Sequence, residues 1–137
     1  MYNYYLSNNS KSKLDTTHHD LQMVIYEAIT NSPIDFGVSS GLRTADEQNV
    51  LYNKGLSKCD GFIKKSNHQD GLAVDIYAYV GGKASYDIKH LCVIAGHIIG
   101  TAKRLGVEVR CGGDWDGDWD FDDQDLIDWP HFELVDK

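Results

Sequence analysis

The sequence is poor in the features that hold small secreted domains together. Its 137 residues include three cysteines, which is an odd number, and no two of them form a C-x-x-C pair. Neither a disulfide framework nor a thiolate zinc ribbon is therefore predicted. We expect Cys59, Cys92 and Cys111 to be free, buried thiols, because a free cysteine behaves as a small apolar residue.

Long apolar segments are also missing. No run approaches the roughly 20 residues that a helix needs to cross a bilayer. The first residues, Met1 to Leu6, lack the basic and apolar regions of a secretory signal. We therefore expect a protein that is made in a cytoplasm, does not insert into membranes, and reaches an external target only when another agent releases it.

Positive charge is scarce as well. The net charge is −8 at neutral pH, which argues against a nucleic acid as partner because surfaces that bind nucleic acids are basic. Eight aspartates between residues 114 and 128, with no basic residue among them, account for the whole of this net charge. The rest of the chain is neutral, so this acidic run is a separate feature of the protein.

The hydrophobic periodicity predicts an α+β fold. Apolar residues recur at helical spacing in two segments, and a capping box, with Thr44 as N-cap and Glu47 three residues later, predicts a third helix. Short apolar or alternating segments bounded by turn residues predict strands. Expected helices cover 17–30, 44–54 and 85–105, and expected strands cover 36–41, 72–80, 107–110 and 131–135. We expect one domain over residues 1–137, with a small, mainly antiparallel sheet, about three helices and a loose polar leader over 1–13.

A carboxylate interrupts one of the predicted apolar strands. Asp75 needs a partner there, either a metal ion or an arginine such as Arg43, because an unpaired buried carboxylate is costly. His68, seven residues earlier, and His131, on the last predicted strand, are candidate ligands of the same metal. Two imidazoles and a carboxylate, with Asp128 as a spare acid, are typical of a catalytic zinc site, which keeps one position open for water.

Three motifs, in order along the chain, resemble those of a known family. Residues 66–75, Ser-Asn-His-Gln-Asp-Gly-Leu-Ala-Val-Asp, match the S-x-H-x-x-G-x-A-x-D signature of the D-Ala-D-Ala metallopeptidase (VanY-like) family, which includes the vancomycin-resistance carboxypeptidases. Residues 40–48 resemble its S-G-x-R-[ST]…Q segment, and 128–131 its acidic-x-x-His element. Two further features resemble the sequences of the small phage endolysins, the L-alanyl-D-glutamate peptidases. They are the aspartate at the acidic position and the segment Gly112–Trp115 followed by Pro130–Phe132.

This resemblance implies a fold and a metal site. The fold would be the one that these DD-peptidases share with Hedgehog signalling domains. His68, Asp75 and His131 would hold Zn²⁺, which lowers the pKa of a bound water towards about 7 and polarises the scissile carbonyl.

The same resemblance assigns roles to four further residues. Asp128 would be the general base that takes a proton from water and passes it to the leaving amine. Arg43 would stabilise the oxyanion or hold a substrate carboxylate. Gln48 and Ser66 would contact the substrate, although a helix-surface contact and a turn cap are the structural alternatives for these two.

The acidic run raises the question of a second cation. Ca²⁺ takes about six to eight oxygen ligands, often from clustered aspartates, and it would relieve the repulsion between like charges. The order of residues does not match an EF-hand loop. The candidate calcium ligands are Asp114, Asp116, Asp118 and Asp122, and the alternative is a solvated acidic loop.

We therefore expect a zinc-dependent peptidoglycan hydrolase, an endolysin that cleaves the L-Ala–D-Glu bond of stem peptides during cell-wall lysis. The alternatives are a D-Ala-D-Ala carboxypeptidase or dipeptidase and a non-enzymatic, Hedgehog-like zinc-binding module. Asp128 argues against the module, which needs no base. The expected setting is a monomeric bacteriophage protein, made in the host cytoplasm, that acts on the wall from the periplasm after release through a holin-type partner.

Overall fold

The computed structural model describes residues 3–114, 116–118, 120 and 127–135 of the chain. Four α-helices, one short 3-10 helix and five strands lie in this part of the chain. In order they are α1 (Asn8–Leu14), α2 (His19–Thr30), β1 (Phe36–Ser40), α3 (Ala45–Asn53), η1 (Asn67–Asp70), β2 (Ala73–Val80), β3 (Lys83–Ser85), α4 (Ile88–Leu105), β4 (Val109–Gly112) and β5 (Asp128–Leu134).

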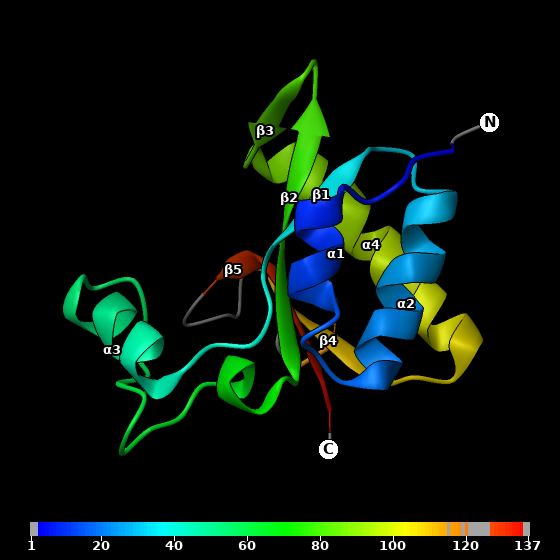
Figure 1. Ribbon diagram of the computed structural model, residues 1–137. Coiled ribbons are helices and arrows are strands. Elements are labelled where there is room, and N and C mark those ends of the chain that lie inside the picture. Colours follow the sequence, from blue (N-terminus) through cyan, green and yellow to red (C-terminus); the bar gives the residue numbers. More distant parts are fainter. Residues whose placement is uncertain (1–2, 115, 119, 121–126, 136–137) are drawn as a thin grey trace.

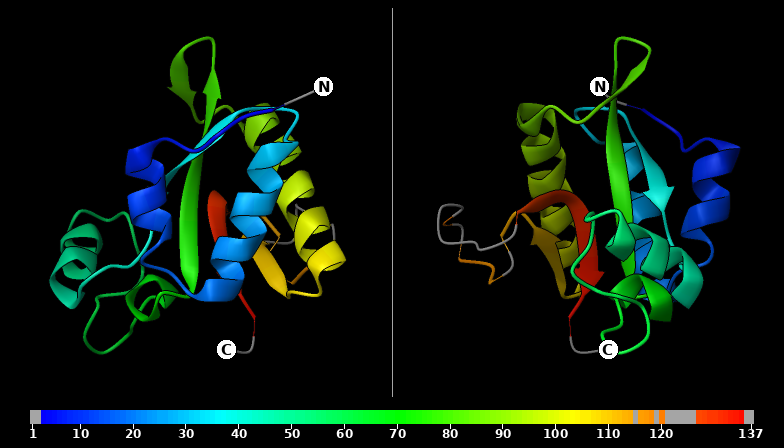
Figure 2. Two further views of the ribbon diagram at one scale, coloured as in Figure 1. Left: turned by 45° about the vertical axis from the view of Figure 1, so that its right-hand side comes forward. Right: turned by 90° about the vertical axis from the view of Figure 1, so that its left-hand side faces the viewer.

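The strands form one antiparallel sheet in the order β1-β2-β5-β4, and β3 pairs with the outer end of β2. Helix α4 packs against β2, β4 and β5, α2 packs on α4, and α1 packs on β1. Figures 1 and 2 show α2 and α4 on one side of β2 and α3 and η1 on the other, while α1 lies along β1 at the edge of the sheet. One face of the sheet is therefore covered by helices, and the other is turned towards α3.

Side chains on β2 divide between these two faces because successive residues of a strand point in opposite directions. Val74, Ile76 and Ala78 are fully buried in the core beneath the helices. Asp75 and Tyr77, which alternate with them, are half-buried on the opposite face. The polar residue that interrupts the apolar strand therefore points away from the hydrophobic core.

The α+β class and the mainly antiparallel sheet are confirmed, but the expected loose leader is wrong over its second half. Helix α1 occupies residues 8–14, with Ser7 as its N-cap. Leu14 is fully buried, and the backbone N–H of Val38 donates a hydrogen bond to the Ser10 hydroxyl. Only Ser10 and Leu14 of this helix are buried, which is too few apolar residues to produce a helical pattern in the sequence.

Several element boundaries also differ from the expectation. Helix α2 begins at His19, with His18 as its N-cap, and not at residue 17. Helix α4 begins at Ile88, with Asp87 as its N-cap, and not at residue 85, because Ser85 lies in strand β3. Strand β4 lies about two residues later than expected. Strand β5 begins at Asp128, three residues earlier than expected, so that Asp128 and His131 belong to the same strand. None of the described helices combines the length and apolarity that a membrane crossing requires.

Candidate metal centre

Strand register brings two of the predicted ligands face to face. In the antiparallel pairing of β2 with β5, Asp75 lies directly opposite His131. His68 reaches the same place from η1, the short helix that precedes β2. One ligand atom from each of the three side chains lies within 4.8 Å of the other two. His68 is 1% exposed and His131 is 8% exposed, so both imidazoles are buried on the face of the sheet that is turned towards α3.

Local sequence explains how η1 presents His68. The Ser66 hydroxyl accepts a hydrogen bond from the backbone N–H of His68 and caps the helix. Gly71 ends it with φ of 70°, a left-handed conformation that glycine adopts without a steric penalty. The serine and the glycine of the predicted signature thus shape the turn that aims the imidazole at Asp75.

In each imidazole, the ring nitrogen that faces away from Asp75, called here the outer nitrogen, lies at hydrogen-bond distance from an acceptor. Nδ1 of His68 lies 2.9 Å from the carbonyl oxygen of Gly41, and Nε2 of His131 lies 2.7 Å from Oε1 of Glu133. Because a carbonyl and a carboxylate only accept hydrogen bonds, these outer nitrogens carry the protons. Nε2 of His68 and Nδ1 of His131 are then available as metal ligands on either side of Asp75 Oδ1, at 3.2 and 3.1 Å. This donor set fits a divalent transition metal.

Glu133 is the centre of a hydrogen-bond network behind His131. Besides His131, it accepts hydrogen bonds from Asn67 Nδ2 at 2.8 Å and from Arg110 Nε at 2.8 Å. Burial opposes ionisation, but the bonds from His131 and Arg110 hold the pKa of Glu133 below its usual value. Glu133 was not among the predicted site residues. The signal in the sequence is its position two residues after His131, on the same face of a strand.

Arg43 also binds Asp75, so both partners considered for this carboxylate are present. Arg43 Nη2 lies 2.9 Å from Asp75 Oδ2, while the two imidazoles face Oδ1. Arg43 Nε donates to the hydroxyl of Ser40 at 3.1 Å. An ion pair on one carboxylate oxygen leaves the other oxygen directed at the imidazoles, so the arginine and a metal ion are compatible partners.

Gln48, a predicted substrate contact, lies behind Arg43. Its side chain is fully buried. Oε1 accepts from Arg43 Nη1 at 3.2 Å, and Nε2 donates to Ser57 Oγ at 2.8 Å and to the Cys59 carbonyl at 3.0 Å. In this arrangement Gln48 positions Arg43 and the following loop. Direct contact of Gln48 or Ser66 with a substrate stays a prediction.

The charges in the site shift three ionisation equilibria. Burial opposes ionisation of Asp75, but hydrogen bonds from His131 and His68 hold its pKa well below its usual range. Burial also lowers the pKa of His131, and its bonds to Asp75 and Glu133 outweigh this and raise the value to about 9. Burial and the charge of Asp75 raise the pKa of Asp128 above its ordinary value.

These residues lie in a cleft of about 750 Å³. One wall is formed by β2 and β5, on the face of the sheet that is turned towards α3, and the other by α3 and the loop that follows it. Asp128 lines the cleft beside Arg43 and the three candidate ligands. The cleft can therefore hold an extended substrate next to a metal ion, a carboxylate and a guanidinium group.

The acidic run contributes a second cluster. Asp114, Asp116 and Asp118 each place a carboxylate oxygen within 4.8 Å of the others. Asp114 is buried, whereas Asp116 and Asp118 are exposed. Asp122, the fourth candidate calcium ligand, lies outside the described residues. Exposed acidic groups often lie this close without an ion, so the calcium site stays a prediction.

The fold and the donor set together define a class of protein. An α+β domain with a His–Asp–His cluster, a further carboxylate and an arginine in one cleft has the parts of a metal-dependent peptidase. Comparison with known families is more specific. The family model for phage L-alanyl-D-glutamate peptidase matches residues 2–135, and the chain belongs to this family.

Individual relatives agree with this assignment. The chain is 32% identical over 134 residues to the L-alanyl-D-glutamate peptidase of Escherichia phage T5, covering 93% of this chain and 95% of the phage protein. It is 29% identical to the peptidoglycan L-alanyl-D-glutamate endopeptidase CwlK of Bacillus subtilis, over 79% of this chain and 65% of CwlK. The crystal structure of the Serratia marcescens L-Ala D-Glu endopeptidase ChiX superposes with a TM-score of 0.79 and 31% identity, over 96% of this chain and 90% of ChiX.

Proposed function

We propose that this protein is a zinc-dependent endopeptidase that hydrolyses the L-Ala–D-Glu bond of peptidoglycan stem peptides. The observation that carries the proposal is the cluster of His68, Asp75 and His131, in which an acceptor holds the outer nitrogen of each imidazole and the inner nitrogen faces Asp75 Oδ1. The choice of bond is supported by the names of the T5, Bacillus and Serratia relatives, which the chain matches over most of its length.

The three ligands would be Nε2 of His68, a carboxylate oxygen of Asp75 and Nδ1 of His131. When bound, Zn²⁺ supplies a Lewis acid for the scissile carbonyl and makes a water molecule more acidic. Zinc accommodates this mixture of two nitrogens and one oxygen and leaves a position for the reaction. Gly41 and Glu133 would keep the two imidazoles in the tautomers that bind the metal.

Asp128 would move the proton in this reaction. Its carboxylate would accept a proton from the attacking water and deliver it to the amine of the departing D-Glu residue. Burial and Asp75 raise the pKa of Asp128, which suits a group that must first accept a proton and then donate it. Arg43, fixed by Gln48 and Ser40, would orient the carbonyl or a carboxylate of the substrate.

The wider setting completes the proposal. The protein would work as a single-domain monomer of phage origin that reaches the cell wall from the host cytoplasm after release by a holin-type partner. The acidic cluster of Asp114, Asp116 and Asp118 would bind Ca²⁺ as a second, regulatory cation, with Asp122 as a further donor.

Digestion of purified peptidoglycan followed by mass spectrometry tests the proposed reaction. The expected products carry a new amino-terminal D-Glu and leave L-Ala on the muramyl side. Chelation should abolish the reaction and Zn²⁺ should restore it, with about one zinc per chain by elemental analysis. Release of free D-Ala alone would show a carboxypeptidase instead, and full activity of a metal-free protein would remove zinc from the mechanism.

A further inference from the structure

Three lysines line the cleft on the wall opposite the metal cluster, that is, the cluster of His68, Asp75 and His131. Lys58, Lys64 and Lys65 all border it and are all exposed. Within the described part of the chain, no carboxylate lies at ion-pair distance from any of them. These are three positive charges in one cleft of a protein whose net charge is −8.

The other cations of the cleft are already engaged. Arg43 pairs with Asp75 and donates to Gln48, and Arg110 pairs with Glu133 at 2.7 Å. To bind either guanidinium group fully, a negatively charged group of a substrate would have to displace the carboxylate of Asp75 or of Glu133. The lysines offer the same attraction without this competition.

The loop that carries the lysines, residues 57–65, is held in shape by hydrogen bonds between its backbone N–H groups and the carboxylate of Asp60. Asp60 Oδ1 accepts hydrogen bonds from the backbone N–H groups of Phe62, Ile63 and Lys64, at 3.1, 3.0 and 2.8 Å. These bonds, above all the one from Lys64, lower the pKa of the Asp60 carboxyl, so it stays ionised at neutral pH. The loop therefore has a defined shape although its lysine side chains extend into solvent.

Side-chain amides fasten the same loop to its neighbours. Asn49 of α3 donates to the Asp60 carbonyl at 2.9 Å, and Gln69 of η1 donates to the Gly61 carbonyl at 2.9 Å. Gly61 has φ of 93°, and a Cβ there would lie 2.6 Å from the Ala45 carbonyl oxygen, so the loop approaches α3 too closely for a side chain. Since η1 also carries His68, the backbone that bears the lysines is held in place relative to the His68–Asp75–His131 cluster.

The chemistry of the proposed substrate supplies a matching anion. In a peptide cleaved between L-Ala and D-Glu, the D-Glu amine lies in the scissile bond. One of its two carboxyl groups carries the rest of the peptide, which leaves the other as a free carboxylate a few bonds from the reaction. We propose that Lys58, Lys64 and Lys65 form a subsite for this carboxylate, an inference that rests on the proposed function.

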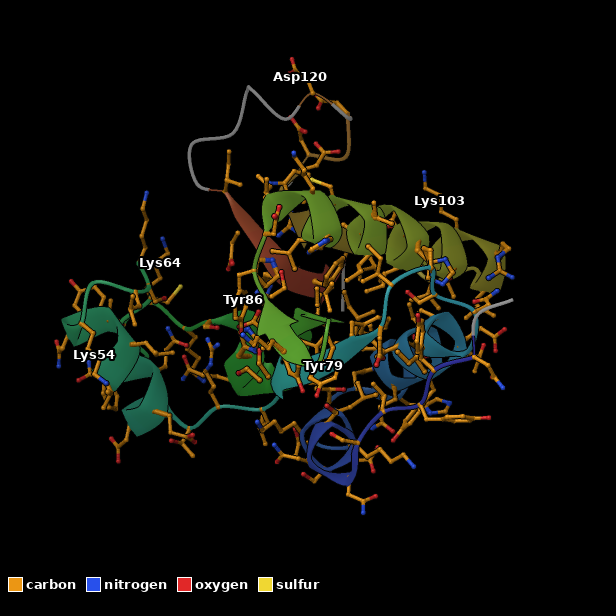
Figure 3. All side chains as sticks on the ribbon, turned by 90° about the horizontal axis from the view of Figure 1, so that it is seen from above. Lys54, Lys64, Tyr79, Tyr86, Lys103 and Asp120 are labelled. Carbon is orange, nitrogen blue, oxygen red and sulfur yellow. The ribbon has the colours of Figure 1, made fainter. Side chains whose placement is uncertain are left out.

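A comparison of two substrates with two enzymes tests this subsite. The substrates are a synthetic stem peptide with the free D-Glu carboxylate and the same peptide with that group converted to a carboxamide. The enzymes are the zinc-loaded wild type and the triple variant Lys58→Gln, Lys64→Gln, Lys65→Gln. The matched control is Lys54→Gln, because Lys54 is an exposed lysine at the end of α3 that does not line the cleft, whereas Lys64 extends from the loop after it (Figure 3).

The expected result is a loss of discrimination. The wild type should cleave the carboxylate peptide with a kcat/KM about tenfold above that of the carboxamide, mostly through KM, which is the scale of a few exposed charge interactions. The triple variant should process both peptides at the carboxamide rate, and Lys54→Gln should match the wild type. Replacing the three lysines by arginine should preserve the preference for the carboxylate.

Two results would overturn the subsite. One is a triple variant that loses rate equally on both peptides, and the other is a variant that keeps the wild-type preference. Failure of the proposed function looks different, because the wild type would then leave the L-Ala–D-Glu bond intact in both peptides and in purified peptidoglycan, and the subsite would fall with it.

Discussion

The two imidazoles of the site turn different nitrogens towards Asp75. His68 turns Nε2 inward because the Gly41 carbonyl holds Nδ1, and His131 turns Nδ1 inward because Glu133 holds Nε2. The clustering of His68, Asp75 and His131 could be predicted from their spacing and from the family resemblance. The tautomers of the two imidazoles could not, since one depends on a backbone carbonyl 27 residues away and the other on how a side chain folds back along its own strand.

Glu133→Gln tests the role of the network behind His131. The amide keeps the shape of the side chain but removes the charge that draws the Nε2 proton of His131, so Nδ1 becomes a weaker ligand. We expect zinc affinity to fall by about 10- to 100-fold, the usual cost of losing such a partner, measured by competition with a chromophoric chelator. Glu108→Gln, at an exposed acid outside this network, is the control. Equal affinity in both variants would leave Glu133 with a structural role only.

Asp128→Asn tests the proposed base. The amide is nearly isosteric and cannot accept a proton at neutral pH, so kcat should fall by about 10²- to 10⁴-fold. Metal content and the unfolding temperature should stay close to those of the wild type, because Asp128 is not among the three candidate ligands. Turnover within a few-fold of the wild type would exclude Asp128 from proton transfer.

At the scale of elements, local signals predicted more than pairing between distant segments. The Thr44–Glu47 capping box is confirmed, with both of its hydrogen bonds at 3.1 Å, because a cap involves only neighbouring residues. The early start of β5 could not be predicted, since Asp128-Trp129-Pro130 shows no alternation. Its pairing with Gly112 of β4, at a register shift, depends on residues far apart in the chain.

Glycine substitutions test this strand pairing. A Cβ on Gly112 would overlap the carbonyl oxygen of Asp128. Gly112→Ala should therefore force β4 and β5 apart, lower the free energy of unfolding by about 1–3 kcal/mol, and reduce activity by moving Asp128. A Cβ on Gly100, exposed in α4, would meet nothing within 4 Å, so Gly100→Ala should raise stability by about 0.5–1 kcal/mol. Urea unfolding measures both, and an unchanged midpoint for Gly112→Ala would contradict the close contact.

At the scale of the whole molecule, the negative and the positive charges around the cleft lie on different segments of the chain. The acidic run holds the entire net negative charge and leads directly into Asp128, whereas the cleft wall opposite the metal cluster carries lysines. Figure 3 shows Asp120 of the acidic run and Lys64 of the lysine-bearing loop extending from separate segments of the molecule. A cation bound by the acidic run would change the field in the cleft without occupying it.

Calcium binding tests this coupling between the acidic run and the cleft. Asp114, Asp116 and Asp118 already place their carboxylates close together, and Ca²⁺ would offset their mutual repulsion. Calorimetric titration of Ca²⁺ into the zinc-loaded protein should give a binding heat, and the lytic rate should rise with occupancy. Mg²⁺ should substitute poorly because it requires a compact octahedral shell. The double variant Asp116→Asn, Asp118→Asn should lose both effects, whereas Glu27→Gln on the exposed side of α2 should keep them. No heat and no change in rate up to about millimolar Ca²⁺, the weak end of protein calcium sites, would identify the run as a solvated acidic loop.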